Sequence, residues 1–277
     1  VAADRLGEIL DLEAEKQENE QRKMAPESLA GDIKFEHVNF RYGTRQRVLE
    51  DIDFTIKKGE KIAFVGESGS GKTTLSKLLL HLYQAESGNI LINDNNIEDI
   101  QIETLRDKIA YIPQETFLFS GSIFENLTLG LDDATMDDII DASKKAQAHE
   151  FINKLPLRYE TRLEENGANL SGGQRQRLAI ARAMLKKPVI LDEATSNLDA
   201  ITERALDKTI SEFSKDVTTI FIAHRLSTIK NCDKIYVLED GKIIESGDHA
   251  SLTALGGKYA QLVKQQSLDT VDVKATA

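Results

Sequence analysis

The sequence has a single cysteine, no long apolar run and fewer basic than acidic residues. Because Cys232 has no second cysteine to pair with, the chain forms no internal disulfide, and a reducing compartment is expected. A transmembrane helix needs about 18 consecutive apolar residues, and no segment approaches that length. Residues 1–5 also lack the start of an apolar signal-peptide core. These absences predict a folded chain that does not itself span a membrane.

The charge balance limits the kind of partner. The chain has 35 basic and 46 acidic residues, which gives a formal net charge of -11. Binding to a phosphate backbone requires a basic face, so no nucleic-acid partner is expected. A single nucleotide is a different case, because a few local groups decide its binding. Hydrophobic residues make up 40% of the 277 residues, which is enough for a sizeable core.

Strand and helix patterns alternate along the chain, which predicts an α/β fold with a mostly parallel sheet. Apolar alternation over residues 33–40 changes parity midway, which indicates a bulge. Asp240 and Gly241 form a two-residue hairpin signal between two strand patterns. Buried strands are expected at 62–65, 90–92, 109–112, 189–191 and 219–223, and helices at 72–83, 135–152, 171–187, 201–213 and 249–266.

Three segments are predicted from composition. Residues 1–31 begin with apolar residues at helical spacing and then become charged, so we expect a helical arm and a linker. Residues 32–266 form the folded domain, and the polar residues 267–277 form a flexible tail. Because the chain starts with Val1 and not with Met, we expect it to be a piece of a longer protein.

Residues 66–73 fit the phosphate-binding pattern G-x-x-x-x-G-K-[ST] in full, with an apolar strand before them and a helix after them. We call this segment the phosphate loop. Its glycines let backbone N–H groups turn toward a phosphate, and the helix N-terminus adds a positive dipole end. Lys72 is expected to reach the β- and γ-phosphates, and the Thr73 hydroxyl to bind Mg²⁺. The expected nucleotide-binding residues are Gly66, Glu67, Ser68, Gly69, Ser70, Gly71, Lys72, Thr73 and Thr74.

The base is not expected to be guanine. A guanine-specific protein carries an Asn-Lys-x-Asp element, and the nearest match, residues 153–156, ends in proline. This argues against a GTPase.

A second anion site is predicted about 100 residues after the phosphate loop. Residues 170–174 read Leu-Ser-Gly-Gly-Gln, in which Ser171 can cap a helix and two glycines expose N–H groups. With both motifs in place, the chain resembles the nucleotide-binding domain of an ABC transporter over nearly all of residues 1–266. The resemblance implies ATP and Mg²⁺ as ligands and ATP hydrolysis as the activity. It also implies a P-loop core with an antiparallel β subdomain and a helical signature subdomain.

The resemblance further implies a head-to-tail homodimer, in which the signature of one copy closes over the ATP that the other copy holds. The signature residues are Leu170, Ser171, Gly172, Gly173 and Gln174, and the loop that crosses the interface is Ser196, Asn197, Leu198 and Asp199. Tyr42 corresponds to the aromatic residue that stacks on adenine. Gln114 and Asp192 correspond, with Thr73, to Mg²⁺ ligands. Glu193 corresponds to the group that polarises the attacking water and His224 to the histidine that contacts the γ-phosphate.

The sequence departs from the family pattern just before Asp192. Three residues separate Pro188 from Asp192, two fewer than usual, so this central strand is expected to be unusually short. Three explanations compete: two residues missing from the sequence, which we favour, a truly short strand, or a domain that hydrolyses ATP poorly. The last supports an alternative function, an ATP-dependent dimerisation module with weak or no hydrolysis. A lesser alternative is a soluble ABC ATPase, which the single phosphate loop and the short spacing between motifs disfavour.

Residues 117–127 and the N-terminal arm are similar to exporter-type members of the family. This similarity implies that the partners are the transmembrane domains of the parent exporter and that the domain lies at the cytoplasmic face of the membrane. The fragment itself is expected to be soluble. The sequences of residues 196–203 and 256–259 are similar to the corresponding segments of bacterial exporters of bacteriocins and double-glycine peptides. Such exporters carry an upstream peptidase domain. Multidrug, lipid and protein-secretion exporters share most of these motifs, so the cargo stays open.

Overall fold

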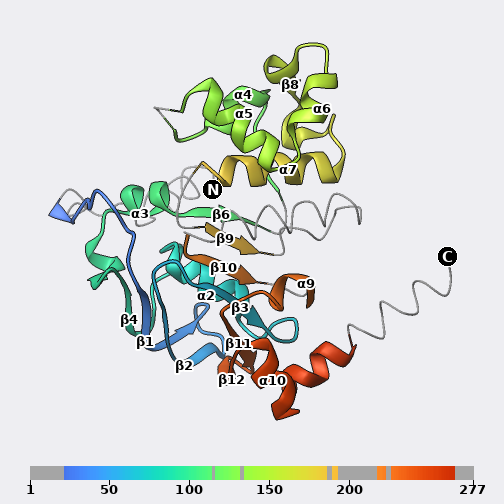
Figure 1. Cartoon of the computed structure of the whole chain (residues 1–277). Coiled ribbons are helices and arrows are strands. Elements are labelled where there is room, and N and C mark those ends of the chain that lie inside the picture. Colours follow the sequence, from blue (N-terminus) through green and yellow to red (C-terminus); the bar gives the residue numbers. More distant parts are fainter. Residues whose placement is uncertain are drawn as a thin grey trace, which may run out of the picture.

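The computed structural model describes residues 22–113, 116–131, 134–185, 189–192, 217–222 and 226–265, with the backbone alone at 189–192 and 226–227 (Figure 1). It contains a large sheet, a smaller sheet beside it, and a group of helices that stands at the top of the view. Most of the predicted arm, the predicted helix at 201–213 and the predicted tail lie outside the described residues.

The larger sheet has six strands in the order β12-β11-β3-β10-β9-β6. The strands from β11 to β6 run parallel, whereas β12 pairs antiparallel with β11. The predicted hairpin at Asp240 and Gly241 is confirmed, with φ values of 47° and 75° that suit a two-residue turn. The strands are β3 (Lys61–Val65), β6 (Ala110–Ile112), β9 (Val189–Asp192), β10 (Thr219–Ile222), β11 (Lys234–Glu239) and β12 (Lys242–Gly247).

The central strand β3 is buried on both faces. Ile62 and Phe64 pack into one apolar cluster, which is shared with the smaller sheet. Ala63 and Val65 pack into a second cluster, which is shared with the helical group. Successive side chains of a strand point to opposite faces, so a strand between two covered faces reads as a continuous apolar run. The prediction of a buried parallel strand at residues 62–65 is confirmed.

The smaller sheet is antiparallel, with the strand order β2-β1-β4-β5. The register of β1 shifts after Phe35, where His37 has a φ of 51°, so the predicted bulge is confirmed. The strand predicted at residues 90–92 belongs to this sheet. The four strands are β1 (Ile33–Arg41), β2 (Arg47–Ile56), β4 (Ser87–Ile92) and β5 (Asn95–Asn96).

Helix α2 (Lys72–Leu79) follows the phosphate loop and contributes Leu75 and Leu78 to the apolar cluster that β3 shares with the smaller sheet. The helix ends at Leu79, four residues earlier than predicted. His81 has a left-handed φ of 50°, its N–H donates to Leu78 O, and the next N–H donates to the carbonyl of Lys77. This pattern of two bonds is the Schellman motif, and it ends the helix inside an apolar sequence that suggested continuation.

The helical group contains α4 (Ile123–Thr128), α5 (Met136–Lys145), α6 (His149–Lys154) and α7 (Gly172–Ala183). The continuous helix predicted at 135–152 is wrong, because the chain breaks at Gln147, where φ is 56°. Further helices are α3 (Ile102–Lys108), α9 (Leu226–Ile229) and α10 (His249–Leu255). Residues 258–265 are helical as well, but the continuous helix predicted at 249–266 is wrong, because α10 ends at the left-handed Gly256, where φ is 70°. Over the described residues, every helix is too short or too polar to cross a bilayer. The predicted architecture is confirmed: a P-loop core, an antiparallel subdomain and a helical subdomain.

Candidate nucleotide site

The phosphate loop lies between the end of β3 and the first turn of α2. Gly71 is the N-cap of α2 with φ 105°, and a Cβ at this position would lie 2.6 Å from the Leu49 side chain. Ser70 N donates to Glu67 O at 3.2 Å, and Thr74 N donates to Gly71 O at 3.0 Å. The loop is therefore a compact turn that presents the first N–H groups and the positive dipole end of α2.

The Lys72 side chain lies within the loop and is only 5% exposed. Its Nζ donates to Gly66 O at 3.0 Å, to Glu67 O at 2.8 Å and to Ser70 Oγ at 3.4 Å. The ammonium is a compact charge that suits phosphate oxygens. The structure thus brings residues 66–73 together around one cation. Their contact with ATP stays a prediction.

A second lysine reaches the loop from far along the chain. Lys258, which follows α10, donates from Nζ to Glu67 Oε1 at 2.7 Å and lies 2.6 Å from Glu239 Oε1. These two carboxylates raise the pKa of the Lys258 ammonium, and the Lys258 ammonium lowers the pKa of Glu67. Sequence reasoning missed Lys258, because no local pattern marks a partner 191 residues away.

Tyr42 lies beside the phosphate loop, although it belongs to the turn between β1 and β2. Its Oη is 3.1 Å from Thr74 Oγ1 in the first turn of α2. The Tyr42 ring packs edge-on against Phe40 at 4.8 Å and against Tyr83 at 5.0 Å between ring centroids. Lys77 Nζ lies 5.9 Å from the centroid of the Tyr42 ring. An aromatic ring is therefore available next to the loop, where the base of a bound nucleotide is expected.

The signature segment forms the N-terminus of α7. Ser171 Oγ accepts from Gln174 N at 3.2 Å, and Gln174 Oε1 accepts from Ser171 N at 2.9 Å, which is a complete capping box. Leu170 is buried and anchors the segment. Arg175, which sequence reasoning did not single out, donates from Nη1 to Leu170 O at 2.7 Å and to Gly167 O at 3.4 Å. The helix N-terminus is thereby held with its glycines partly exposed.

The two predicted anion sites lie in different parts of the molecule. Helix α7 packs against α4, α5 and β6 in the helical group, whereas α2 lies with β1, β2 and β3 lower in the view (Figure 1). In the view, β6 and β9 of the larger sheet lie between α7 and α2. The structure of one chain therefore keeps the signature apart from the phosphate loop of the same chain.

Several predicted residues lie outside the described part of the chain: Gln114, Glu193, Ser196, Asn197, Leu198, Asp199 and His224. The backbone of Asp192 is described and forms the last position of β9, opposite Ile222 of β10. Strand β9 has four residues, as many as β10, and it pairs with β10 along its whole length. Strand β9, which includes Asp192 as its last residue, is thus as long as β10.

The donor groups fit Mg²⁺ bound together with a nucleotide. Mg²⁺ takes oxygen ligands and is usually held by one or two protein groups plus phosphate oxygens and water. Thr73, in the first turn of α2, and Asp192, at the last backbone position of β9, are residue types that carry such oxygens. Within the described ranges, no group of three or more His, Cys, Asp or Glu residues forms a metal cage.

Two exposed aromatic side chains follow the predicted position of Gln114. Phe117 and Phe119 are each 48% exposed and pack edge-on against each other at 4.9 Å between centroids. The buried Asn126 accepts from Phe119 N at 2.8 Å and donates to Phe119 O at 2.9 Å, which fixes this segment against α4. The apolar pair is thus held at the surface of the protein.

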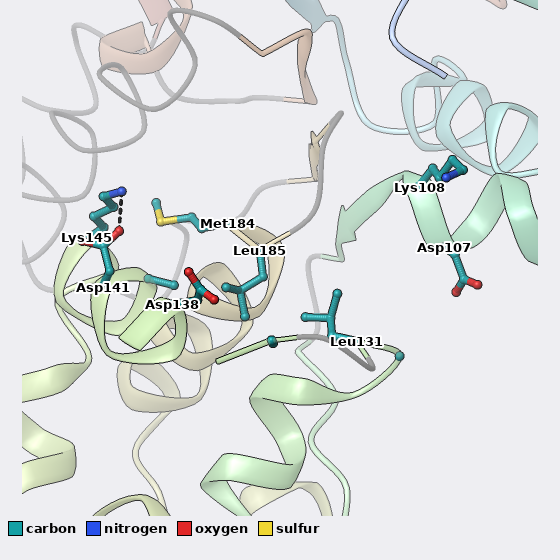
Figure 2. Close-up of a pocket in the computed structure, with 11 residues that line it drawn as sticks. Asp107, Lys108, Leu131, Asp138, Asp141, Lys145, Met184 and Leu185 are labelled. Atoms are coloured by element: carbon teal, nitrogen blue, oxygen red, sulfur yellow. Dashed lines mark ion pairs between the residues drawn. The ribbon is translucent and has the colours of Figure 1, made fainter. Parts of the chain in front are cut away.

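A pocket of about 710 Å³ opens between α3 of the core and the helical group (Figure 2). Asp107 and Lys108 line it from α3, and the ion pair of Asp141 and Lys145 lines it from α5. Leu185 adds an apolar contact beyond the end of α7. Among the described residues, its lining contains none of the predicted nucleotide-binding residues, and it lies at the junction of α3 and the helical group.

Comparison with known proteins gives consistent matches. The sequence profile of the family described as ABC transporter matches residues 49–196. The chain is 47% identical to the pediocin PA-1 transport/processing ATP-binding protein PedD of Pediococcus acidilactici, over 96% of this chain and 37% of that protein. It is 45% identical to the sophorolipid transporter of Starmerella bombicola, over 91% of this chain and 20% of that protein.

A solved structure shares the fold. It is a bacterial Atm1-family ABC exporter with ATP bound, with a TM-score of 0.88 and 35% identity. The match covers 95% of this chain and 46% of the exporter chain. This chain spans less than half the length of the curated relatives that it matches.

Proposed function

The chain belongs to the ABC transporter family, and we propose on this premise that it is the ATP-hydrolysing domain of an exporter. It would bind Mg-ATP in the phosphate loop and work as a head-to-tail dimer. The observation that carries the proposal is the phosphate loop closed around the buried Lys72 ammonium, between β3 and α2. A triphosphate at this position would meet backbone N–H groups, a helix dipole and a lysine together.

The proposed chemistry distributes roles over several elements. Lys72 neutralises charge on the β- and γ-phosphate oxygens, and the Thr73 hydroxyl and the Asp192 carboxylate hold Mg²⁺ with Gln114. Glu193 takes a proton from the attacking water, and His224 orients the γ-phosphate. Mg²⁺ supplies charge neutralisation at the phosphate oxygens when it is bound. Tyr42 stacks on the adenine ring.

The proposed dimer follows from the separation of the two anion sites. The N-terminus of α7, with Ser171 and Gly173, is a ready anion site. In its own chain it belongs to the helical group with α4 and α5, whereas the phosphate loop lies between β3 and α2. Two copies related head to tail would place each signature over the other copy's ATP, and the interface would be the same on both subunits.

The proposed partners are transmembrane domains at the cytoplasmic face of a membrane. The exposed pair Phe117 and Phe119 and the pocket between α3 and α5 supply an apolar contact and a concavity near the helical group. Exposed aromatic pairs of this kind are typical of protein contact sites. The cargo is proposed to be a bacteriocin-like peptide. The name of PedD gives pediocin PA-1 transport and processing as the role of that protein. The identity to a sophorolipid transporter is nearly equal, so sequence identity in this domain does not by itself support one cargo over another.

The test is phosphate release at millimolar Mg-ATP with three variants. Glu193→Gln should lower turnover at least about 100-fold while ATP still drives dimerisation, because it removes the proton acceptor and leaves the binding groups. Lys72→Ala should abolish both binding and turnover. Lys58→Ala removes an exposed lysine outside the site and is the matched control.

Each outcome has a clear meaning. Turnover of Glu193→Gln equal to that of the parent chain contradicts the assigned base. ATP-driven dimerisation without any phosphate release in the parent chain favours the binding-only alternative. Equal ATP affinity in Lys72→Ala and Lys58→Ala contradicts the assignment of the phosphate loop.

A further inference from the structure

Two arginines face each other at the base of the turn that carries Tyr42. Strand β1 ends at Arg41, β2 begins at Arg47, and the two are register partners across the antiparallel pair. Like charges directly opposite each other on neighbouring strands repel. The turn formed by residues 42–46 would therefore open at its base unless an anion lies between the two guanidinium groups.

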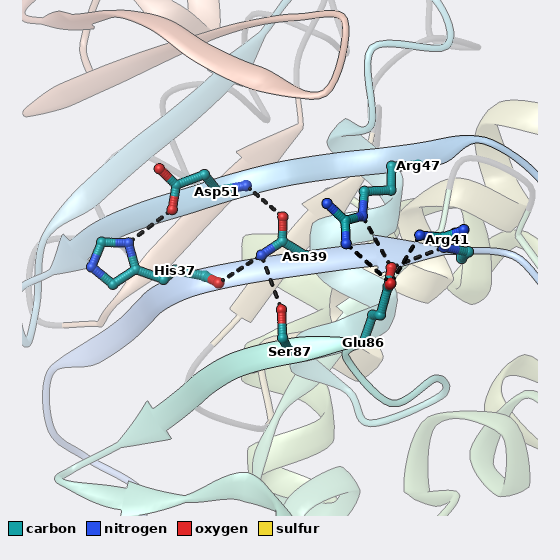
Figure 3. A network of polar contacts seen from close by, with 7 residues as sticks. All are labelled: His37, Asn39, Arg41, Arg47, Asp51, Glu86 and Ser87. Carbon is teal, nitrogen blue, oxygen red and sulfur yellow. Dashed lines mark hydrogen bonds and ion pairs between the residues drawn. The ribbon is translucent and has the colours of Figure 1, made fainter.

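Glu86 is that anion, as Figure 3 shows. Arg41 donates from Nε and Nη2 to the two carboxylate oxygens of Glu86, both at 2.9 Å. Arg47 donates from Nε and Nη2 to the same two oxygens at 3.2 and 3.1 Å. Both pairs are bidentate, which is the strong and directional form of an arginine–carboxylate contact.

The Glu86 carboxylate stays ionised at neutral pH. The hydrogen bonds from Arg47 and Arg41 lower the pKa of Glu86 to about 2. Its side chain is 34% exposed, and those of Arg41 and Arg47 are 39% and 42% exposed. A single ion pair of this exposure contributes little to stability. Here, however, one carboxylate serves two bidentate partners that would otherwise repel each other.

The segment that carries Glu86 also contacts the Tyr42 ring. Glu86 N donates to Asn39 O in β1 at 2.8 Å, and Tyr83, three residues before Glu86, packs edge-on against Tyr42. The Tyr42 Oη lies 3.1 Å from Thr74 Oγ1. Tyr42 is thus held by its ring through Tyr83 and by both ends of its turn through Glu86.

On the basis of the proposed stacking of Tyr42 on adenine, we propose that Glu86 is a positioning residue for base recognition. By pairing with both Arg41 and Arg47, Glu86 fixes the turn of residues 42–46 and so aims the Tyr42 ring at the bound base. Glu86 does not contact the phosphate loop in the described structure. Its removal should therefore affect recognition of the base and leave recognition of the phosphates unchanged.

The test compares ATP with inorganic tripolyphosphate, both measured by titration calorimetry on the full chain. Glu86→Gln keeps the shape of the side chain and removes its charge. We expect it to weaken ATP binding about threefold to tenfold, a part of the affinity that a base–aromatic stack contributes. Tripolyphosphate, which has no base, should bind Glu86→Gln as tightly as it binds the parent chain. Asp94→Asn is the matched control, because it removes the exposed ion pair with Lys34 beside the same sheet.

Tyr42→Ala separates this inference from the proposed function. If Tyr42→Ala leaves ATP affinity unchanged, the adenine stack is wrong and the role of Glu86 is lost with it. If Tyr42→Ala weakens ATP binding but Glu86→Gln does not, only the role of Glu86 is overturned. Equal weakening of ATP and tripolyphosphate in Glu86→Gln also overturns it, because a general structural role predicts that result. Glu86→Gln added to Tyr42→Ala should have no further effect.

A spectroscopic measurement and a rescue variant complete the test. The chain has no tryptophan, so Tyr42→Trp introduces a single tryptophan at the position in question, which can be excited selectively over the tyrosines. Its fluorescence anisotropy should fall when Glu86→Gln is added and stay constant when Asp94→Asn is added. Arg47→Gln added to Glu86→Gln removes the repulsion between the two guanidinium groups and should restore part of the ATP affinity. No change in anisotropy and no rescue would overturn the proposal.

Discussion

Lys258 Nζ lies 2.7 Å from Glu67 Oε1, although 191 residues separate the two in the sequence. Glu67 is the acidic side chain of the phosphate loop, and its carboxylate would repel the phosphates of a bound nucleotide. Lys258 also contacts Glu239 at the end of β11, so it is held between two carboxylates. The C-terminal part of the domain thus offsets the one unfavourable charge in the phosphate loop.

Removal of Lys258 should therefore weaken ATP binding. We expect Lys258→Ala to raise the dissociation constant of ATP about twofold to fivefold, since exposed ion pairs have effects of this size. The effect should be larger at low ionic strength, because salt screens exposed charges. Titration calorimetry at two salt concentrations measures both the change in the dissociation constant and its dependence on ionic strength. Glu67→Gln combined with Lys258→Ala should restore the parent affinity, and a double variant as weak as Lys258→Ala alone contradicts the explanation.

The pKa of the His37 side chain should lie above the ordinary value for histidine. Its Nδ1 lies 2.8 Å from Asp51 Oδ1, and its Nε2 lies 3.8 Å from Asp53 Oδ2. The hydrogen bond to Asp51, the charge of Asp51 and then that of Asp53 raise the pKa of His37 above 6.5. A proton NMR titration measures it. Asp51→Asn should lower this pKa more than Asp53→Asn, because the latter removes a longer contact without a hydrogen bond.

The same contact has a consequence for stability. A histidine whose pKa is higher in the folded than in the unfolded state stabilises the fold fully below the unfolded value. That contribution is lost as the pH rises through the folded value. The free energy of unfolding should therefore decrease slightly between about pH 6 and the raised pKa of His37. Asp51→Asn should flatten this part of the curve, and an unchanged slope in Asp51→Asn would contradict the assignment to His37.

The sequence predicted those features that local patterns encode. The phosphate loop, the Asp240 and Gly241 hairpin and the bulge near His37 each depend on a few consecutive residues. Residue type and spacing suffice for them, because glycine conformation, turn chemistry and strand parity act over short distances. The mostly parallel order of the larger sheet also follows from alternating strand and helix patterns.

Features that depend on distant contacts could not be predicted in this way. Helix α2 ends at Leu79 because His81 adopts a left-handed conformation, while the apolar pattern continues beyond it. Lys258 pairs with Glu67, which is 191 residues away, and Glu86 pairs with Arg41 and Arg47, which are 45 and 39 residues away, so no spacing rule marks either residue. Charged residues at such positions look like ordinary surface residues until the fold is known.

Ser171 should matter for dimerisation as well as for the helix that it caps. Ser171→Ala removes the side-chain half of the capping box of α7, which costs about 0.5–2 kcal/mol of stability. Thr135→Ala removes the equivalent group of α5, which has the same capping box, and is the matched control. Both variants should unfold at lower denaturant concentration. Only Ser171→Ala should also lose ATP-driven dimerisation of the Glu193→Gln chain, measured by gel filtration. Loss of the dimer in both variants would show that helix stability alone is responsible.

Cys232 should report on the opening of the core. The thiol is 6% exposed and packs with Ile229 and Ile235, and burial together with the charge of Asp233 raises its pKa to about 12. Thiolate is the reactive form, so a disulfide reagent should label the folded chain far more slowly than the unfolded chain at neutral pH. The rate should rise with denaturant in parallel with the unfolding curve, since labelling requires opening. Because the folded thiol ionises only near pH 12 and the unfolded thiol near 9.0, the free energy of unfolding should also fall as the pH rises above about 9. Equal labelling rates in buffer and in denaturant would contradict the burial of this thiol, and Cys232→Ser, which should not be labelled at all, is the control.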